Sequence, residues 1–255
     1  MPDPVLITEV LRRADAGVSV NPFICRTEDG REIYVKPAGT LPESLVYEWL
    51  GSSLAREMNL PVADFTLIDL PTLLVDSVMG IDTSGLNAGI GFGSYHVGTG
   101  CRDMEIGDIG RMSPGLMAEI LAFDLWIHNG DRILNNQGGN PNLVIGPDQE
   151  ESFLIDHDNA FDPNFSPEEL RSYHLGWNQR SYWLCAIERQ IWEAKTRSAL
   201  ERLPEFWKEL PESWLERSPN LSKNPSRALD SICANLMNPS DNSDAFWAPL
   251  ISPQS

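Results

Sequence analysis

The sequence predicts a two-lobed α+β protein, with a small strand-rich N-terminal part and a larger helix-rich C-terminal part. Short runs of β-branched and aromatic residues, bounded by turn residues, surround one amphipathic helix near the N-terminus. From Pro114 onward, apolar residues recur mainly at helical spacing. We therefore expect an N-terminal lobe over residues 1–80, an inter-lobe region over 81–113 and a helical lobe over 114–255.

The expected N-terminal elements follow from local patterns. Val18–Arg26 and Arg31–Lys36 flank an Asp-Gly pair, a favoured two-residue hairpin turn. Glu43–Asn59 has apolar residues at helical period and is expected to form a helix. Phe65–Leu70 and Leu73–Met79 resemble further strands. The run GLNAGIGFGSYHVGTG is rich in glycine and shows little periodicity, so we expect a linker there.

Composition and charge exclude several classes of protein. No apolar run approaches the roughly 18 to 20 residues that a membrane span needs, and the first residues lack the order of a secretory signal. A net charge of −18 opposes binding to a phosphate backbone. The four cysteines form no CxxC pair. We expect a soluble, cytoplasmic protein that binds neither nucleic acid nor membrane.

The stretch WIHNGDRILNNQGGNPNLVI, residues 126–145, is unusually rich in asparagine, aspartate and glycine. The preceding apolar helical stripe stops near Asn129, so Asp131 begins a polar loop. NLVI and SFLI are two short β-like runs separated by GPDQEE, which indicates a hairpin. A hairpin places the GGNPN segment beside Asp156 in LIDHD. Carboxylate and amide oxygens grouped in this way are typical ligands of magnesium.

These residues resemble a known family. NGDR, NPNLV and LIDHDNAF, in that order, resemble the catalytic loop and metal-binding segment of HipA-like kinases, which share the protein-kinase and phosphatidylinositol-kinase-like fold. REIYVK, followed by VYEWLGSSLAREMNLPV, resembles the strand lysine and next helix of that family. The resemblance covers about Asn21 to Asp162 and implies a two-lobed kinase-like fold with ATP and Mg²⁺ in its cleft.

The resemblance also implies roles for individual residues. The ammonium of Lys36 would face the α and β phosphates of ATP, and Glu48 would hold that lysine. Asp131 would orient or deprotonate the acceptor hydroxyl, while Arg132 would be a structural or phosphate-facing partner. Asp156 would bind the metal ion that bridges the phosphates.

Two parts of the expected site depart from the wider kinase pattern. The common spacing of five residues after the catalytic acid gives Asn136 as a metal ligand, whereas NPN followed by a strand gives Asn140. The hairpin argument favours Asn140, which lies nearer the strand. In place of a glycine-rich phosphate loop the chain has DAGVSVNPF, in which Gly17 and Ser19 are the candidates for nucleotide contact.

The acceptor rests on the resemblance alone. It implies a serine or threonine hydroxyl of a protein substrate. Two alternatives remain open: a kinase that acts on a lipid or small-molecule hydroxyl, and a non-catalytic binding module that keeps the fold and holds a partner on its C-terminal helices.

Overall fold

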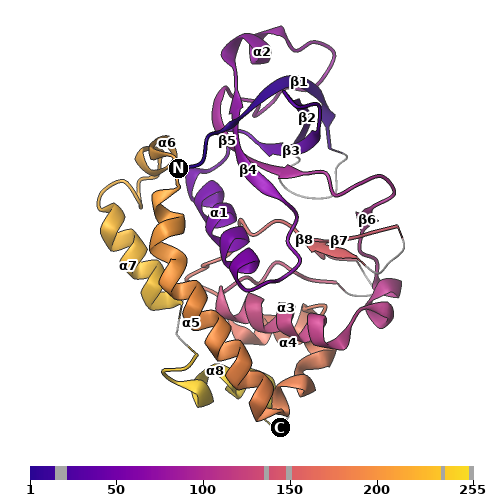
Figure 1. The fold of residues 1–255 in the computed structure, drawn as a ribbon, viewed down its shortest axis with the longest axis vertical. Helices are drawn as coiled ribbons and strands as arrows, with labels where there is room; N and C mark the ends of the chain where they lie inside the picture. Colours follow the sequence, from indigo (N-terminus) through magenta and orange to yellow (C-terminus); the bar gives the residue numbers. More distant parts are fainter. Residues whose placement is uncertain (15–21, 135–137, 148–150, 237–238, 253–255) are drawn as a thin grey trace.

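The N-terminal strands close into a five-stranded barrel in a computed structural model that describes all residues except 15–21, 135–137, 148–150, 237–238 and 253–255 (Figure 1). Around the barrel the order is β1-β2-β3-β5-β4. The strands are β1 (Val5–Arg13), β2 (Phe23–Thr27), β3 (Glu32–Lys36), β4 (Phe65–Leu70) and β5 (Gly89–Tyr95). Neighbouring strands are antiparallel, except that β1 and β4 pair in parallel.

The β2–β3 hairpin determines which way Lys36 points. Gly30 has a φ of 84° at the predicted turn, a conformation that glycine adopts without strain. Phe23 pairs with Val35 across the hairpin. Side chains alternate along a strand, so Ile33 and Val35 are fully buried in the barrel and Lys36 belongs to the opposite face. The predicted hairpin is thus confirmed for the residues that the structure describes, and residues 18–21 of its predicted first strand lie outside them.

The expected linker is wrong for its middle part, because Gly89–Tyr95 forms strand β5 between β3 and β4. A Cβ added to Gly91 would lie 2.5 Å from the carbonyl oxygen of Lys36. A Cβ added to Gly93 would lie 2.5 Å from Cδ1 of Ile33. A side chain at either position would clash with a neighbouring strand, so both need glycine, and these glycines interrupt the apolar alternation by which a strand is recognised in the sequence.

The expected strand over Leu73–Met79 is also wrong, because its first part is helix α2 (Thr72–Ser77). Leu74, Val75 and Val78 pack against the barrel core, whereas Leu73 remains 84% exposed. Contacts spaced by one and four residues suit a helix. A short apolar run does not separate the two possibilities.

Helix α1 (Pro42–Glu57) lies between the barrel and the C-terminal helices (Figure 1). It packs against α5 (Ala186–Lys208) and α6 (Glu212–Arg217). Its apolar residues belong to one continuous hydrophobic cluster with those helices, in which Trp214 is fully buried. The Trp214 Nε1–H also donates to the carbonyl oxygen of Ile90 in β5, over 2.8 Å. The C-terminal helices therefore hold both the helix and the barrel.

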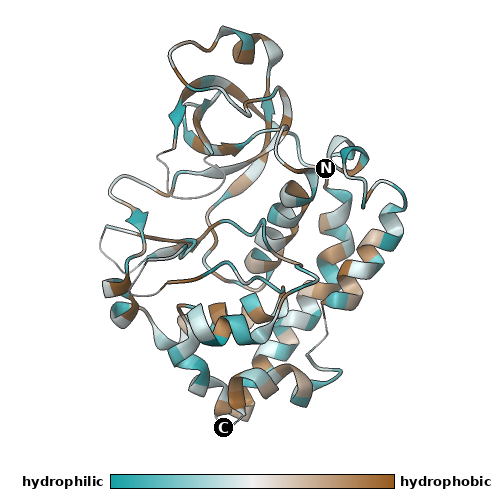
Figure 2. Cartoon of the chain, turned by 180° about the vertical axis from the view of Figure 1, so that it is seen from behind, coloured by the Kyte–Doolittle hydropathy of each residue, from teal (hydrophilic) through white to brown (hydrophobic). Residues whose placement is uncertain are grey.

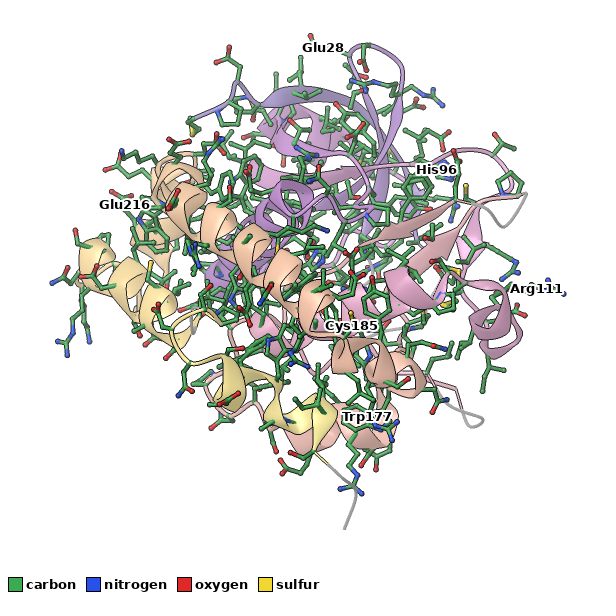
Figure 3. All side chains as sticks on the ribbon, turned by 60° about the horizontal axis from the view of Figure 1, so that its bottom comes forward. Glu28, His96, Arg111, Trp177, Cys185 and Glu216 are labelled. Carbon is green, nitrogen blue, oxygen red and sulfur yellow. The ribbon has the colours of Figure 1, made fainter. Side chains whose placement is uncertain are left out.

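The rest of the chain is mainly helical, as predicted. Its helices are η1 (Ile106–Arg111), α3 (Pro114–Trp126), α4 (Pro167–Tyr173), η2 (Trp177–Leu184), α7 (Pro225–Asn235) and α8 (Ser243–Ile251). Apolar stretches alternate with polar ones along them (Figure 2). Trp177 of η2 lies toward the opposite end of the view from Glu28 on the β2–β3 turn (Figure 3). Among the described helices, none has both the length and the apolar character needed to cross a bilayer.

A small sheet lies beside the helices, with strands β6 (Arg102–Asp103), β7 (Leu143–Ile145) and β8 (Ser152–Leu154) in that order. Leu143 pairs with Leu154, so the predicted hairpin of NLVI and SFLI is confirmed. The structure is thus a mixed α+β fold. The two-lobed arrangement and the boundaries at residues 80 and 113 stay predictions.

Gly51 gives a test of how closely α1 approaches the segment after β8. A Cβ added to Gly51 would lie 2.6 Å from Cβ of His157. Alanine normally stabilises a helix interior relative to glycine. We expect the opposite sign for Gly51→Ala, a loss of about 1 to 3 kcal/mol in the free energy of unfolding measured in urea. The control is Gly107→Ala, where an added Cβ would meet no atom within 4 Å. Equal stabilities for the two variants would contradict the packing.

Candidate active site

Lys36 joins three carboxylates from two other parts of the chain. Its Nζ lies 2.7 Å from Oε2 of Glu48 in α1. The same atom lies 2.6 Å from Oδ1 of Asp156 and 2.9 Å from Oδ2 of Asp158, both of which follow β8. The structure thus brings together the predicted Lys36, Glu48 and Asp156. We call these three residues and Asp158 the lysine cluster.

Burial and charge act against each other in the lysine cluster. Burial lowers the pKa of Lys36, but the three carboxylates raise it further, and the result lies well above the ordinary value. Burial raises the pKa of Glu48 to about 7 despite the nearby ammonium. Burial also opposes ionisation of Asp156, yet Lys36 brings its pKa down to about 2. With one ammonium among three carboxylates, ionised carboxylates leave excess negative charge that a cation would compensate.

Positive φ angles gather around this region. Asp156 has φ of 59°, Asn142 of 45°, His128 of 55° and Phe161 of 60°. Such backbone conformations are uncommon outside glycine and cost energy, especially for a bulky residue such as phenylalanine. They cluster at functional sites more often than elsewhere. The backbone conformation and the charged cluster therefore mark the same region as a candidate functional site.

Asp131 is held by three asparagine amides. Its Oδ2 accepts hydrogen bonds from Nδ2 of Asn140 at 2.8 Å, of Asn142 at 3.0 Å and of Asn159 at 3.2 Å. Burial raises the pKa of Asp131, while these donors act in the opposite direction. The asparagines thus orient the carboxylate that the sequence predicts to orient or deprotonate the acceptor hydroxyl.

Arg132 lies inside the protein with a fully buried side chain. Its Nε donates to Oδ2 of Asp124 in α3 over 2.8 Å, and its Nη1 donates to the carbonyl oxygen of Asn142. Asp124 also lies 2.9 Å from Nε2 of His174. Since Arg132 joins α3 to the start of β7, its geometry favours the structural alternative over the phosphate-facing one.

The observed hairpin adds a further asparagine to the candidate metal ligands. Asn140 donates from its Nδ2 to Oδ2 of Asp131 over 2.8 Å. Asn142 directly precedes β7, and its carbonyl oxygen accepts from the N–H of Ile155, next to Asp156, over 3.1 Å. Asn142 therefore joins Asn140 as a candidate metal ligand, and the choice between them stays a prediction. Asn136 lies outside the described residues, as do Gly17 and Ser19 of the expected phosphate loop.

Asp158 is the second residue that the sequence argument missed. It stands two positions after Asp156, whose left-handed backbone turns the segment so that Asp158 approaches the same ammonium. That spacing within DHD was the available signal. Both aspartates reach the same ammonium.

The residues present fit a divalent cation that binds with a nucleotide. Glu48, Asp156 and Asp158 each offer a carboxylate oxygen, and the three atoms lie within 4.8 Å of one another. Carboxylate oxygen is the ligand that magnesium prefers, and magnesium is usually held by one or two carboxylates together with substrate phosphates. The side chain of Asp156 remains 30% exposed, so the cluster is accessible from solvent.

Comparison with known proteins agrees with this geometry. The family model described as HipA-like kinase matches residues 7–250. A search of curated protein sequences gave no match. Among solved structures, the chain is similar to the proinflammatory kinase CtkA of Helicobacter pylori, with a TM-score of 0.54 and 10% identity. That alignment covers 99% of this chain and 100% of CtkA.

The buried Asp124–Arg132 pair leads to a prediction about acid stability. Burial opposes ionisation of Asp124, but Arg132 outweighs it and lowers the pKa from 3.8 to about 2. Its ionised form therefore stabilises the folded state above about pH 4, and this contribution is lost as pH falls toward 2. Asp124→Asn should lower the free energy of unfolding by about 3 kcal/mol at pH 7, since it leaves the buried charge of Arg132 unpaired.

The measurement is urea unfolding at several pH values between 2 and 7. Below pH 4, the free energy of unfolding should change less steeply with pH in Asp124→Asn than in the wild type. The exposed Asp230 on α7 supplies the control. Asp230→Asn should leave unchanged both the free energy of unfolding at pH 7 and its dependence on pH below pH 4. The assignment would be wrong if the two variants behaved alike.

Proposed function

Because the chain belongs to the HipA-like kinase family, we propose that it transfers the γ-phosphoryl group of Mg-ATP to a serine or threonine hydroxyl of a protein. The observation that supports this most is the lysine cluster beside an oriented Asp131. Phosphoryl transfer needs a cation for the phosphates, ligands for a metal ion and an acid near the attacking hydroxyl. Every one of these groups has a candidate among the described residues.

Lys36 supplies the protein's positive charge for the phosphates, and Glu48 keeps its ammonium in place. Asp156, Asp158 and Asn142 are the proposed ligands of magnesium, which when bound with ATP neutralises phosphate charge. The carboxylates of Asp156 and Asp158 would otherwise repel the phosphates, so nucleotide binding is expected to require the metal ion.

Asp131 is the proposed catalytic acid–base residue. Three amide donors hold its Oδ2, which fixes the direction of the carboxylate toward an incoming hydroxyl. Partial burial raises its pKa and so makes the carboxylate a better proton acceptor than an exposed aspartate. The proton of the acceptor hydroxyl would pass to this carboxylate as the oxygen attacks the γ-phosphorus, while the bond from that phosphorus to the β,γ-bridging oxygen breaks and ADP leaves.

The family supports a protein acceptor, and a lipid or small-molecule hydroxyl is the second candidate. The set of Lys36, Glu48, Asp131 and Asp156 argues against a non-catalytic binding module, because a module that only holds a partner does not need it. The net charge of −18 supports the proposal that the protein binds no nucleic acid. We propose a cytoplasmic location on the composition alone.

Transfer from γ-labelled ATP tests the proposal. Asp131→Asn keeps the size of the side chain and removes the acid, so transfer to a mixture of protein acceptors should fall at least about 100-fold. Mg-ATP binding, measured by calorimetry, should persist in the variant. The exposed Asp230→Asn is the matched control and should transfer at the wild-type rate. Transfer that is absent from the wild type, or equal in Asp131→Asn, would contradict the assignment.

A magnesium titration separates the two asparagines of NPN. Asn142→Ala removes a donor to Asp131 and also an amide next to the hairpin strand, whereas Asn140→Ala removes a donor to Asp131 alone. We expect Asn142→Ala to raise the magnesium concentration needed for half-maximal transfer by about tenfold, and Asn140→Ala to lower the rate with little change in that concentration. The reverse ranking would return the metal site to Asn140.

A further inference from the structure

The carboxylate of Glu48 receives three donors, of which Lys36 is only one. The backbone N–H of His157 donates to its Oε2 over 3.1 Å. The hydroxyl of Ser52, one helical turn further along α1, lies 3.4 Å from its Oε1. Ser52 Oγ also lies 3.1 Å from Nδ1 of the His157 ring. Ser52 is 2% exposed and His157 is fully buried, so protein groups replace water here.

The direction of these hydrogen bonds follows from Nε2 of His157, the ring nitrogen that has no hydrogen-bond partner among the described residues. A serine hydroxyl has a single proton, which goes either to Glu48 or to the ring of His157. Within the described chain, Nε2 of His157 is buried and has no hydrogen-bond partner. A buried N–H without an acceptor is rarer than an unpaired acceptor. Nε2 is therefore the bare nitrogen, and the proton of the neutral ring resides on Nδ1.

With that tautomer, the protons have one consistent order. His157 Nδ1–H donates to Ser52 Oγ, and Ser52 Oγ–H is then free to donate to Glu48 Oε1. The helix permits this approach because it has glycine at position 51, where an added Cβ would lie 2.6 Å from His157 Cβ. His157 thus binds Glu48 through its backbone N–H and, by way of Ser52, through its ring.

We propose that His157 and Ser52 are positioning residues, which hold Glu48 in the orientation that keeps Lys36 ready for the nucleotide. His157 stands between Asp156 and Asp158. The hydrogen bonds from its ring through Ser52 to Glu48 therefore also connect α1 to the segment that carries the two aspartates. Loss of either link should leave Lys36 less well placed between Glu48 and Asp156. The kinetic part of this inference rests on the proposed function, whereas the tautomer does not.

Nitrogen-15 NMR of histidine-labelled protein tests the tautomer directly. The chain has four histidines, and the His157 signals are those that disappear in His157→Asn. A protonated and a bare ring nitrogen resonate far apart, so the spectrum shows which nitrogen carries the proton. We expect protonated Nδ1 and bare Nε2 at neutral pH. Protonated Nε2 would overturn the proposal, because Ser52 would then have to donate to the ring.

Steady-state kinetics test the effect on the nucleotide site. Ser52→Ala and His157→Phe should each lower kcat/KM for ATP by about tenfold, the usual scale for one lost hydrogen bond to a charged group. His157→Asn, whose amide restores a donor near the position of Nδ1, should recover most of the loss. The matched control is Ser53→Ala, a buried serine on the same helix turned about 100° from Ser52.

If Ser52 had only a structural role, Ser52→Ala would have a lower melting temperature, but the folded variant would keep the kcat/KM of Ser53→Ala. That result would overturn the proposal. The two hypotheses fail separately. An inactive wild type would refute the kinase assignment, while the NMR spectrum would still decide the hydrogen-bond chain from His157 to Glu48.

Discussion

The ion pair between Lys36 and Glu48 is the interaction on which the arrangement of the site depends. Glu48 is 2% exposed and Lys36 is 8% exposed, so neither charge has water to stabilise it. A buried charge that loses its partner is strongly destabilising. The barrel strand that ends at Lys36 must therefore meet α1 at Glu48, and the segment after β8 must approach closely enough to bring Asp156 and Asp158 to the same ammonium.

Several features far from the charges maintain this meeting of three segments. Helix α1 is packed from its other side by α5 and α6, and the hydroxyl of Ser218, after α6, donates to Glu43 in its first turn. The Asp124–Arg132 pair joins α3 to the carbonyl oxygen of Asn142 at the start of β7. Because Asp124 and Arg132 are fully buried and α1 belongs to the hydrophobic cluster, the positions of Glu48 and of the Asp131 loop are determined by the core as well as by the charges.

Much of this could be predicted from the sequence, because the relevant signals are local. The Asp-Gly turn places Lys36 on the barrel, and the hairpin of NLVI and SFLI brings the asparagine loop to Asp156. Other features depend on contacts that no local pattern contains. The glycines of β5 interrupt the alternation of apolar and polar residues that predicts a strand. They are needed because atoms of the neighbouring strands occupy the space that a side chain would fill. The backbone hydrogen bond from Ile155 to Asn142, which makes Asn142 a candidate metal ligand, is also such a contact.

Calorimetric titration of the wild type with ATP, with and without magnesium, tests the central claim most directly. The account holds that three carboxylates around one ammonium form a nucleotide site that accepts phosphates only together with a cation. It predicts saturable binding of Mg-ATP and at least about tenfold weaker binding of ATP in the presence of a chelator. Equal binding in both conditions, or no binding in either, would contradict it.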